Sequence, residues 1–448
     1  MNRSWNSLAF SVASLLLGAE PSPAASPDGG FLFTSAPRYE PWAWTRGGAR
    51  FPDGSTVLRA ERGKVEPLVP SLASSSDPFV SFDGKKVLVS GHVPGSQRRQ
   101  IWEIILDGGQ VRQMTSGDAD CVRPLYLPDG RIAYTRLEDG GSSIEVAGDG
   151  VSPERITFTP DRLITADILD DGRILFEIAR TPGDGIHREI WTVLPDGSGA
   201  ALLVADQGRS WCEPVRSADG TILFLDRQRW VNSFDPQSEN VKRVAGFPGL
   251  VFGPPASLTK DRSLVSMQLS GRIHAELYYW DGRSAIRADL RRPAGAWAVQ
   301  PTALTGRPRP KDYPASLLPN RKEAVVLFHA AATREQRPAA ASVRALTWQP
   351  SAGVRPLGVL PLQADGSFYS VVDSDRPLRF QFLDSSGRTI GEQESWIWLR
   401  PGEQRTCVGC HASTKLAPSN RVPLALKSGR PSRFREGQGP IGESETLP

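Results

Sequence analysis

Two cysteines and one histidine near the end of the chain have side chains that could bind a metal or take part in redox chemistry. Cys407 and Cys410 are separated by Val408 and Gly409, and His411 follows directly. On one tight turn, each thiol can add across a vinyl group of haem, and the adjacent imidazole becomes the proximal iron ligand. With four Cys and five His in 448 residues, chance gives this pattern with a probability of roughly 10⁻³ or less. We therefore expect one covalently attached haem c.

The cysteine pair has two other interpretations. A Cys-x-x-Cys pair also suits a structural disulfide or a thiol redox couple. It could supply half of a zinc site, but a closed tetrahedral site needs further ligands, and the remaining cysteines, Cys121 and Cys212, lie far upstream. Haem attachment accounts for the adjacent histidine as well as for the thiols, so it remains the main expectation.

The residues around the motif limit the second axial ligand of the iron. The segment after the motif is rich in proline, has little helical periodicity and contains no methionine. A small helical cytochrome c domain with a downstream Met ligand therefore cannot be built from it. The second axial position is open or filled by another residue, and the candidates are His329, at the end of a predicted strand, and Lys415. The simpler interpretations are a structural histidine and a solvated lysine.

The start of the chain has the layout of a secretory signal peptide. Arg3 precedes a short apolar run over residues 8–19, and Ser22-Pro23-Ala24 offers small residues for cleavage. We expect residues 1–25 to be removed and the protein to be periplasmic or secreted, which is also where bacterial haem c is attached. A retained N-terminal anchor is the alternative. No other stretch approaches the ~20 apolar residues of a spanning helix, so no membrane span is expected after signal cleavage.

Composition indicates a turn-rich β protein. The chain has 43 Gly, 38 Pro and 12 Trp, and 39% of its residues are hydrophobic, which is enough to form a core. The net charge of +4 is small, and basic residues are interspersed with acidic ones. This pattern argues against a nucleic-acid partner.

Residues 30–292 contain a repeat in which short β-branched runs follow Asp-Gly turns. The turn aspartates are spaced roughly 40 to 50 residues apart, and such a period with several strands per unit predicts a β-propeller. We interpret these aspartates as hairpin formers rather than calcium ligands. The clear copies begin at Asp83, Asp129, Asp171 and Asp219, with a weaker one at Asp261. Asp53-Gly54 marks a sixth blade, which strands from both ends of the domain could complete.

The remaining cysteines and histidines of the propeller have structural interpretations. Cys121 and Cys212 each precede a proline of an inner strand. Blades that are not neighbours are separated by the propeller axis, so we expect two buried free thiols rather than a disulfide. His92, His187 and His274 are expected to be surface groups of the blade loops rather than ligands.

The last third of the chain contains a second β domain. Residues 293–319 hold six prolines and are expected to form an inter-domain linker or a strap over the propeller. Alternating apolar residues over 320–405 predict a small antiparallel β-sandwich, whose last strand is residues 395–399. Residues 330–341 are rich in alanine and suggest a loop or a short helix. Residues 406–448 form the haem-attachment segment and an irregular tail. The fold class is thus all-β, a six-bladed type of propeller followed by a sandwich.

Two parts of the chain resemble known families. The turns Ser81-Phe82-Asp83-Gly84-Lys85 and Leu127-Pro128-Asp129-Gly130-Arg131 are similar to the repeats of TolB-type propellers. Residues 365–411, with Asp365-Gly366-Ser367-Phe368, Pro401-Gly402-Glu403 and the motif ending at His411, resemble the middle domain of hydrazine synthase alpha subunits.

The second resemblance implies a sandwich with one haem c on Cys407 and Cys410. In hydrazine synthase, a tyrosine four residues beyond the motif histidine binds the iron, whereas this chain has Lys415 there. The synthase subunit also has a further haem domain and works with partner subunits, whereas this chain has one motif. A complete hydrazine synthase is therefore not expected.

Axial ligation separates the possible functions. A six-coordinate haem favours electron transfer or docking of a partner redox protein, which is the interpretation we prefer. An open iron favours an oxidoreductase subunit that acts on a small nitrogen compound or another inorganic or organic substrate, similar to hydrazine synthase. In a third interpretation, the propeller is a protein-interaction adaptor. The rest of the sequence has no evident catalytic triad or phosphate loop, and it does not decide whether the protein is an enzyme.

Overall fold

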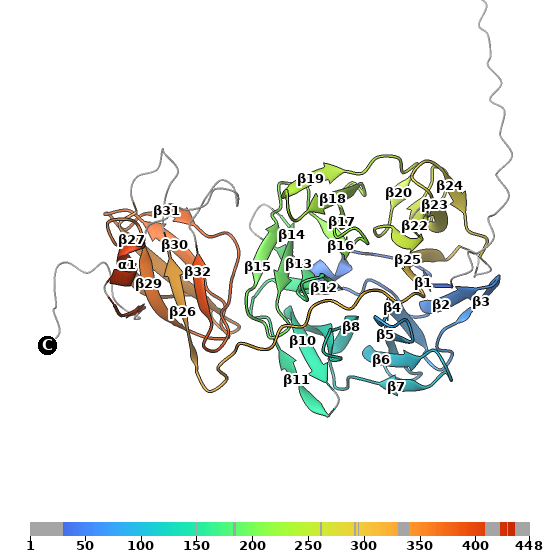
Figure 1. Cartoon of the computed structure of the whole chain (residues 1–448), viewed down its shortest axis with the longest axis horizontal. Coiled ribbons are helices and arrows are strands. Elements are labelled where there is room, and N and C mark those ends of the chain that lie inside the picture. Colours follow the sequence, from blue (N-terminus) through green and yellow to red (C-terminus); the bar gives the residue numbers. More distant parts are fainter. Residues whose placement is uncertain are drawn as a thin grey trace, which may run out of the picture.

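The chain folds into two β-sheet domains that lie side by side (Figure 1). The computed structural model describes residues 30–148, 150–181, 185–259, 262–290, 293, 295–329, 340–407, 422–427 and 429–434. The predicted signal peptide and most of the alanine-rich interval lie outside these residues. None of the helices in the described part is long and apolar enough to cross a membrane.

Six sheets form the first domain, which confirms the propeller expected from the Asp-Gly repeat. Blade 1 consists of β25 (Trp297–Ala303), β1 (Phe31–Ala36), β2 (Thr56–Glu61) and β3 (Lys64–Pro67). Blade 2 consists of β4 (Ser74–Val80), β5 (Lys86–His92), β6 (Gln100–Ile105) and β7 (Val111–Gln113). Blade 3 consists of β8 (Asp120–Tyr126), β9 (Ile132–Glu138), β10 (Gly141–Gly148) and β11 (Val151–Arg155).

The other three blades continue the same order from the inner strand outward. Blade 4 consists of β12 (Arg162–Ile168), β13 (Ile174–Arg180), β14 (His187–Val193) and β15 (Ala201–Val204). Blade 5 consists of β16 (Cys212–Arg216), β17 (Ile222–Leu225), β18 (Val231–Asp235) and β19 (Asn240–Arg243). Blade 6 consists of β20 (Leu250–Val251), β21 (Ala256–Thr259), β22 (Arg262–Gln268), β23 (Glu276–Trp280) and β24 (Ala285–Arg287).

The two ends of the first domain close the propeller in blade 1. Strand β25 pairs antiparallel with β1, so the last strand of the domain completes the blade that begins it. This confirms the expected sixth blade, but it corrects the linker, because β25 lies inside residues 293–319. Pro301 is tolerated there because β25 is an edge strand and its register shifts between the partners of Leu32 and Thr34.

The Asp-Gly turns join the first and second strands of the blades. In the first of them, Asp83 Oδ1 accepts hydrogen bonds from Ser81 Oγ at 2.6 Å and from the Lys85 amide at 3.0 Å. Gly84 has a φ of 73°, a left-handed conformation that glycine adopts without strain. Asp129, Asp171 and Asp219 each accept the amide of the residue two positions ahead in the same way. The carboxylates therefore serve the turns, as the hairpin interpretation predicted.

Residues 304–318 form a strap across one face of the propeller, along the gold trace in Figure 1. The Arg307 amide donates to Phe82 O at 2.9 Å, and the Lys311 amide donates to Asp170 O at 3.1 Å. At the far end, the Leu318 amide donates to Pro401 O at 3.0 Å. The strap thus ties blade 2 and blade 4 to the second domain, and the expected strap is confirmed from residue 304 onward.

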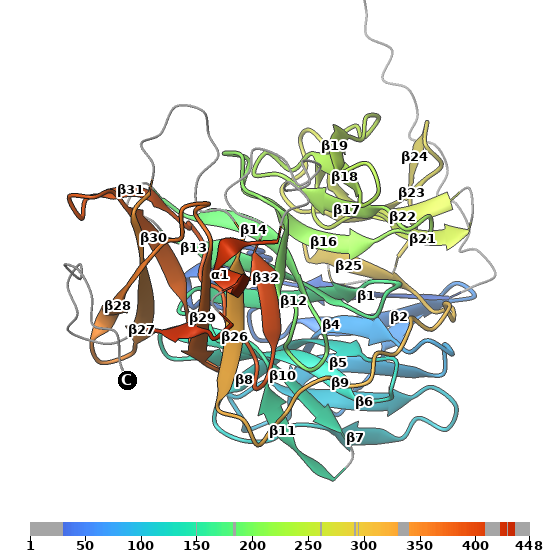
Figure 2. The ribbon, with the colours of Figure 1, turned by 60° about the vertical axis from the view of Figure 1, so that its left-hand side comes forward.

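Two four-stranded sheets form the second domain (Figure 2). Its core is made of antiparallel pairs, as expected, but β32 joins β26 and β33 joins β29 in parallel. One sheet has the order β32 (Gln404–Cys407), β26 (Glu323–Phe328), β29 (Phe368–Asp373) and β33 (Ser432–Arg433). The other has the order β28 (Gly353–Pro361), β27 (Ser342–Gln349), β30 (Arg379–Leu383) and β31 (Thr389–Glu392), and a short helix, α1 (Leu424–Lys427), lies beside β29.

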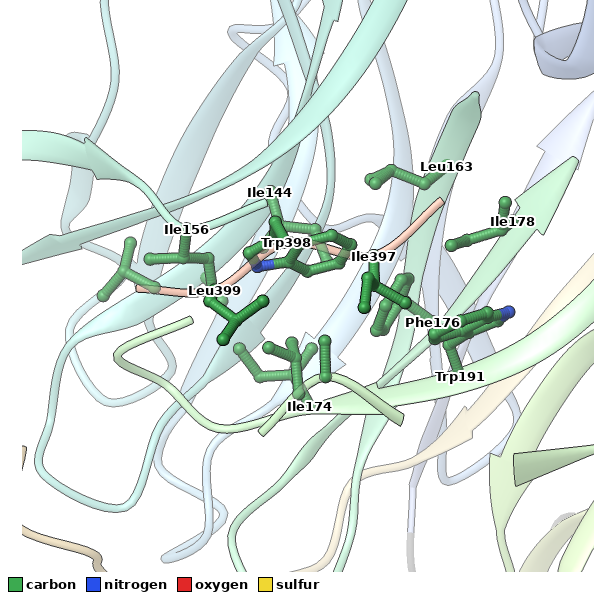
Figure 3. Packing of buried hydrophobic residues seen from close by; sticks show 14 of the residues in the cluster. Ile144, Ile156, Leu163, Ile174, Phe176, Ile178, Trp191, Ile397, Trp398 and Leu399 are labelled. Carbon is green, nitrogen blue, oxygen red and sulfur yellow. The ribbon is translucent and has the colours of Figure 1, made fainter. Parts of the chain in front are cut away.

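Residues 395–399 are not the sandwich strand that the alternation predicted. Apart from a single bridge between Ile397 and Leu378, they form no ladder. Trp398 and Leu399 are completely buried, because this segment lies in the contact between the two domains. Figure 3 shows Trp398 surrounded by propeller side chains such as Ile144, Ile156 and Ile174. The apolar residues of this segment pack between the two domains, and their alternation in the sequence is the same as that of a strand.

Candidate functional site

Strand β32 places Cys407 at the end of the sheet, beside His329. It runs parallel to β26 with Phe328 opposite Cys407, and the His329 amide donates a 2.8 Å hydrogen bond to Cys407 O. The structure therefore brings together two of the residues that the sequence analysis selected. Cys410, His411 and Lys415 lie outside the described residues, so their positions are not tested.

An aromatic cluster borders Cys407. Phe328 stacks on Phe368 with ring centroids 5.2 Å apart, and Phe380 and Phe434 contact Phe368 edge to face. Cys407 is half-buried and packs against the apolar cluster that contains these rings. A macrocycle with a large apolar surface and a thioether bond at Cys407 would fit such apolar surroundings.

A second candidate site lies on the propeller axis, where the sequence analysis did not predict one. Four inner strands carry a residue before proline whose φ is left-handed, between 54° and 56°. The strand register shifts at each of these positions. The four residues are Asp77, Arg123, Glu213 and Gln300. Non-glycine residues in this conformation cost of order 1–3 kcal/mol each and cluster at functional sites.

Arg50 connects these residues across the axis. Its Nη1 donates to Asp77 Oδ1 at 2.8 Å, and its Nη2 donates to Glu213 Oε1 at 2.9 Å. Tyr39 donates to the same Glu213 oxygen at 3.0 Å, and Arg123 Nη1 donates to Glu213 Oε2 at 3.3 Å. Asp77 and Glu213 lie in different blades, so the network holds inner strands together around the axis.

The network shifts the pKa values of two neighbouring glutamates, Glu213 and Glu177, in opposite directions. The guanidinium groups of Arg50 and Arg123 outweigh the effect of burial on Glu213 and lower its pKa. Glu177 is also buried, and burial together with the charge of Glu213 raises its pKa to about 7. Glu177 Oε1 accepts the Glu213 amide at 2.9 Å. One acid therefore stays ionised while its neighbour titrates near neutral pH.

The segment between β1 and β2 covers one end of the axis. It contains the short 3-10 helix η1 (Ala43–Arg46), and its residues reach all the other blades. Tyr39 contacts Phe252 of blade 6, and Trp44 packs against Val122 of blade 3 and Ile164 of blade 4. Arg50 binds blades 2 and 5, as described above. The segment therefore acts as a plug, and at the other end a cavity of about 450 Å³ lies between the inner strands and the strap.

The two propeller cysteines are buried free thiols, as expected. Burial raises the pKa of each to about 11. Thiols in this state are poor nucleophiles at neutral pH. Neither contributes to the cavity at the end of the axis.

Sequence reasoning missed the axial network because its members are far apart in the chain. Arg50 comes from the plug, whereas Asp77, Arg123 and Glu213 come from three blades. The available signal was a charged or polar residue before proline in the inner strand of several repeats. That spacing predicts polar side chains at the same depth in different blades.

The fold defines a class of protein: a six-bladed β-propeller joined to a β-sandwich. Comparison with known sequences identifies a related family for one region of the chain. Residues 321–412 match the family described as the hydrazine synthase alpha subunit middle domain. Hydrazine synthase subunit alpha from Kuenenia stuttgartiensis is 32% identical over 83 residues, which cover 18% of this chain and only 10% of that subunit. The resemblance expected from the sequence is thus confirmed for this region.

Solved structures extend the similarity in fold. Kuenenia stuttgartiensis hydrazine synthase matches 90% of this chain and 72% of its own, with a TM-score of 0.77 and 16% identity. TolB from Acinetobacter baumannii matches 64% of this chain and 68% of its own, with a TM-score of 0.46 and 16% identity. At this identity, the match to hydrazine synthase shows a shared fold of propeller and sandwich together.

Proposed function

We propose that the protein is an oxidoreductase subunit that carries one haem c on Cys407 and Cys410, with His411 as the proximal ligand. The observation that carries this proposal is the position of Cys407, at the end of β32 and against an aromatic cluster, in a domain similar to the hydrazine synthase alpha middle domain. When bound, the haem supplies one-electron chemistry or a Lewis-acidic iron.

The chain's own residues have two roles in this proposal. Strand β32 fixes the first attachment cysteine relative to β26, and the aromatic side chains exclude water from one side of that position. Trp398 and its neighbours pack the sandwich on the propeller, so the attachment point has a defined position relative to the propeller.

A second function, electron transfer to a partner redox protein, is favoured by His329. The backbone amide of His329 donates a hydrogen bond to Cys407 O, so His329 is a direct neighbour of the attachment cysteine across the sheet. If His329 or Lys415 fills the second axial position, the iron has no place for a substrate. Axial ligation therefore decides between the two functions.

The test is the visible spectrum of the protein exported together with a haem-attachment machinery. We expect a covalent haem that survives denaturation, and a reduced spectrum that shifts when carbon monoxide is added. A low-spin spectrum indifferent to carbon monoxide would replace catalysis by electron transfer. Absence of covalent haem would overturn both functions.

A cysteine control makes the attachment site specific. Cys407→Ala should reduce covalent haem, since one of the two thioether bonds is lost. Cys212→Ala removes a buried thiol from blade 5 and should leave haem content unchanged. Equal haem in the two variants would contradict the assigned site.

A further inference from the structure

The cavity at the end of the propeller axis has the features of a small-molecule site. Its volume of about 450 Å³ falls within the ~300–1,000 Å³ range of ligand pockets. The inner strands supply Asp77, Arg123, Glu213 and Gln300, and the strap supplies Arg307. Four of these five residues have the left-handed backbone conformation described above. The cavity is therefore built from strained positions that the packing of several blades maintains.

The carboxylates of this cavity already accept hydrogen bonds from the protein. Asp77 Oδ1 accepts from Arg50 and from Gln300 Nε2, and both oxygens of Glu213 have donors. Asp167 accepts the amides of Ile168 and Arg216 as well as Arg307 Nη1. The side chains of Asp77, Glu213 and Asp167 are only 4%, 7% and 3% exposed. They have little capacity left for a ligand.

Two guanidinium groups retain donors that the protein does not use. Arg123 uses Nε for Thr165 O and Nη1 for Glu213, and its Nη2 makes no hydrogen bond to a described residue. Arg307 uses Nη1 for Asp167, and its Nη2 is buried without a partner among the described residues. Their side chains are 14% and 28% exposed, at least twice as much as those of the acids. The unused polar capacity of the cavity is therefore cationic.

The other charged group at the rim does not change this balance. Arg216 Nε lies 2.7 Å from Asp170 Oδ1, so its charge is already paired. Arg307 also stacks on Phe79, with its Cζ 4.7 Å from the ring centroid. This contact holds the guanidinium of the strap residue against the inner strand β4.

The remaining wall is apolar. Five prolines from five different blades surround the cavity, together with Phe79, and all but Pro254, which lies between β20 and β21, belong to inner strands. The prolines are Pro78, Pro124, Pro214, Pro254 and Pro301. Rigid apolar rings around two unused guanidinium donors suit a molecule with one anionic end and an apolar body.

We propose that this axial cavity binds a small organic carboxylate, whose carboxylate accepts hydrogen bonds from Arg123 and Arg307 and whose apolar part contacts the ring of prolines. Arg307 belongs to the strap that leads to the sandwich, so an occupied cavity would also hold the strap against the inner strands. This site is separate from the one around Cys407, and it does not depend on haem.

Isothermal titration calorimetry with 4-phenylbutyrate tests the proposal. The acid should bind to the full-length protein, whereas its amide and 4-phenylbutylamine, which have a similar shape but no negative charge, should bind at least about tenfold more weakly. Tighter binding of the amine would show that the acidic residues dominate the cavity. Equal binding of the three compounds, or no binding of the acid at millimolar concentrations, would also overturn the proposal.

Two substitutions on the strap locate the site. Arg307→Gln removes one of the two guanidinium groups that have an unused donor, and it should weaken binding of 4-phenylbutyrate by about tenfold or more. Arg309→Gln removes a cation on the same strap that does not line the cavity, and it should leave binding within about twofold. The same loss in both variants would overturn the assignment. Binding should persist in Cys407→Ala, so failure of the haem proposal can be told from failure of this one.

Discussion

The indole Nε1 of Trp398 donates a 3.0 Å hydrogen bond to Gly197 O, and this bond joins the sandwich to blade 4 of the propeller. Trp398 is completely buried, so the bond lies inside the contact between the domains. Nearby, Arg400 donates to Asp196 O at 2.9 Å and to Asp375 Oδ1 at 3.0 Å. Hydrogen bonds and apolar packing thus occur together in the same contact between the domains, and both hold the sandwich on the propeller.

Trp398→Ala should destabilise the protein by about 3–5 kcal/mol, because it leaves a cavity between the domains and removes the bond to Gly197. We expect the sandwich to unfold at a lower temperature than the propeller, giving two calorimetric transitions. Tyr313→Ala, which removes an aromatic ring that is 46% exposed on the strap, should change the midpoints little. A single transition at the wild-type temperature for Trp398→Ala would contradict the role of this contact.

The sequence was informative wherever one repeat unit contained its own signal. The Asp-Gly turns predicted the blades, because each turn needs a carboxylate and a left-handed glycine within four residues. The strand β25 was missed because Pro301 suggested a linker, while a bulge on an inner edge strand accommodates it. Residues 395–399 were misread because a buried domain contact and a strand share the same apolar pattern.

The axial site could not be derived from local patterns. The partners of Arg50 are fixed only when blades 2 and 5 face each other across the axis. Propeller closure depends on β25 pairing with β1, at the opposite end of the domain. The candidate haem site could be predicted from the sequence, because its two cysteines and its histidine lie within five consecutive residues. The structure adds which side chains surround Cys407.

Arg50→Met should destabilise the protein by about 3–5 kcal/mol, since it leaves Asp77 and Glu213 buried without their main counterion. Chemical denaturation at neutral pH measures the loss. Arg38→Met is the matched control, because Arg38 is 71% exposed and pairs with Glu40 on the surface. Its loss should stay below about 1 kcal/mol. Similar losses in the two variants would show that the axial ion pairs contribute little.

His329→Ala tests whether the histidine beside Cys407 is the second axial ligand. If it is, the variant should keep covalent haem but change from a low-spin spectrum to a high-spin one that binds carbon monoxide, since removal of the ligand opens the iron. Lys415→Ala is measured in parallel for the other candidate. His274→Ala, in the propeller, should leave the spectrum unchanged. A low-spin spectrum in both His329→Ala and Lys415→Ala would exclude both residues as the ligand.

Glu177 should make the stability of the protein fall as the pH rises from about 4.5 to about 7. Burial and the charge of Glu213 raise its pKa from 4.5 to about 7 in the folded state, so in this window the folded protein binds more protons than the unfolded chain. Below the window both states are protonated, and above it both are ionised, so the penalty reaches a plateau on the order of 3 kcal/mol. Glu213 acts in the opposite sense and in a lower window. Its pKa is lowered by Arg50 and Arg123, so its contribution is present above pH 4.5 and is lost as the pH falls.

Glu177→Gln isolates this effect, because the amide has the shape of the protonated acid and its oxygen can still accept the Glu213 amide. The variant should lack the decline between pH 4.5 and 7 and should therefore be more stable than the wild type at pH 8. Urea denaturation at a series of pH values measures the difference, and Glu66→Gln, at an exposed position of β3, serves as the control that should follow the wild type. If the Glu177→Gln and wild-type curves run parallel through this window, Glu177 is ionised in the folded protein and the axis carries one more negative charge than we infer.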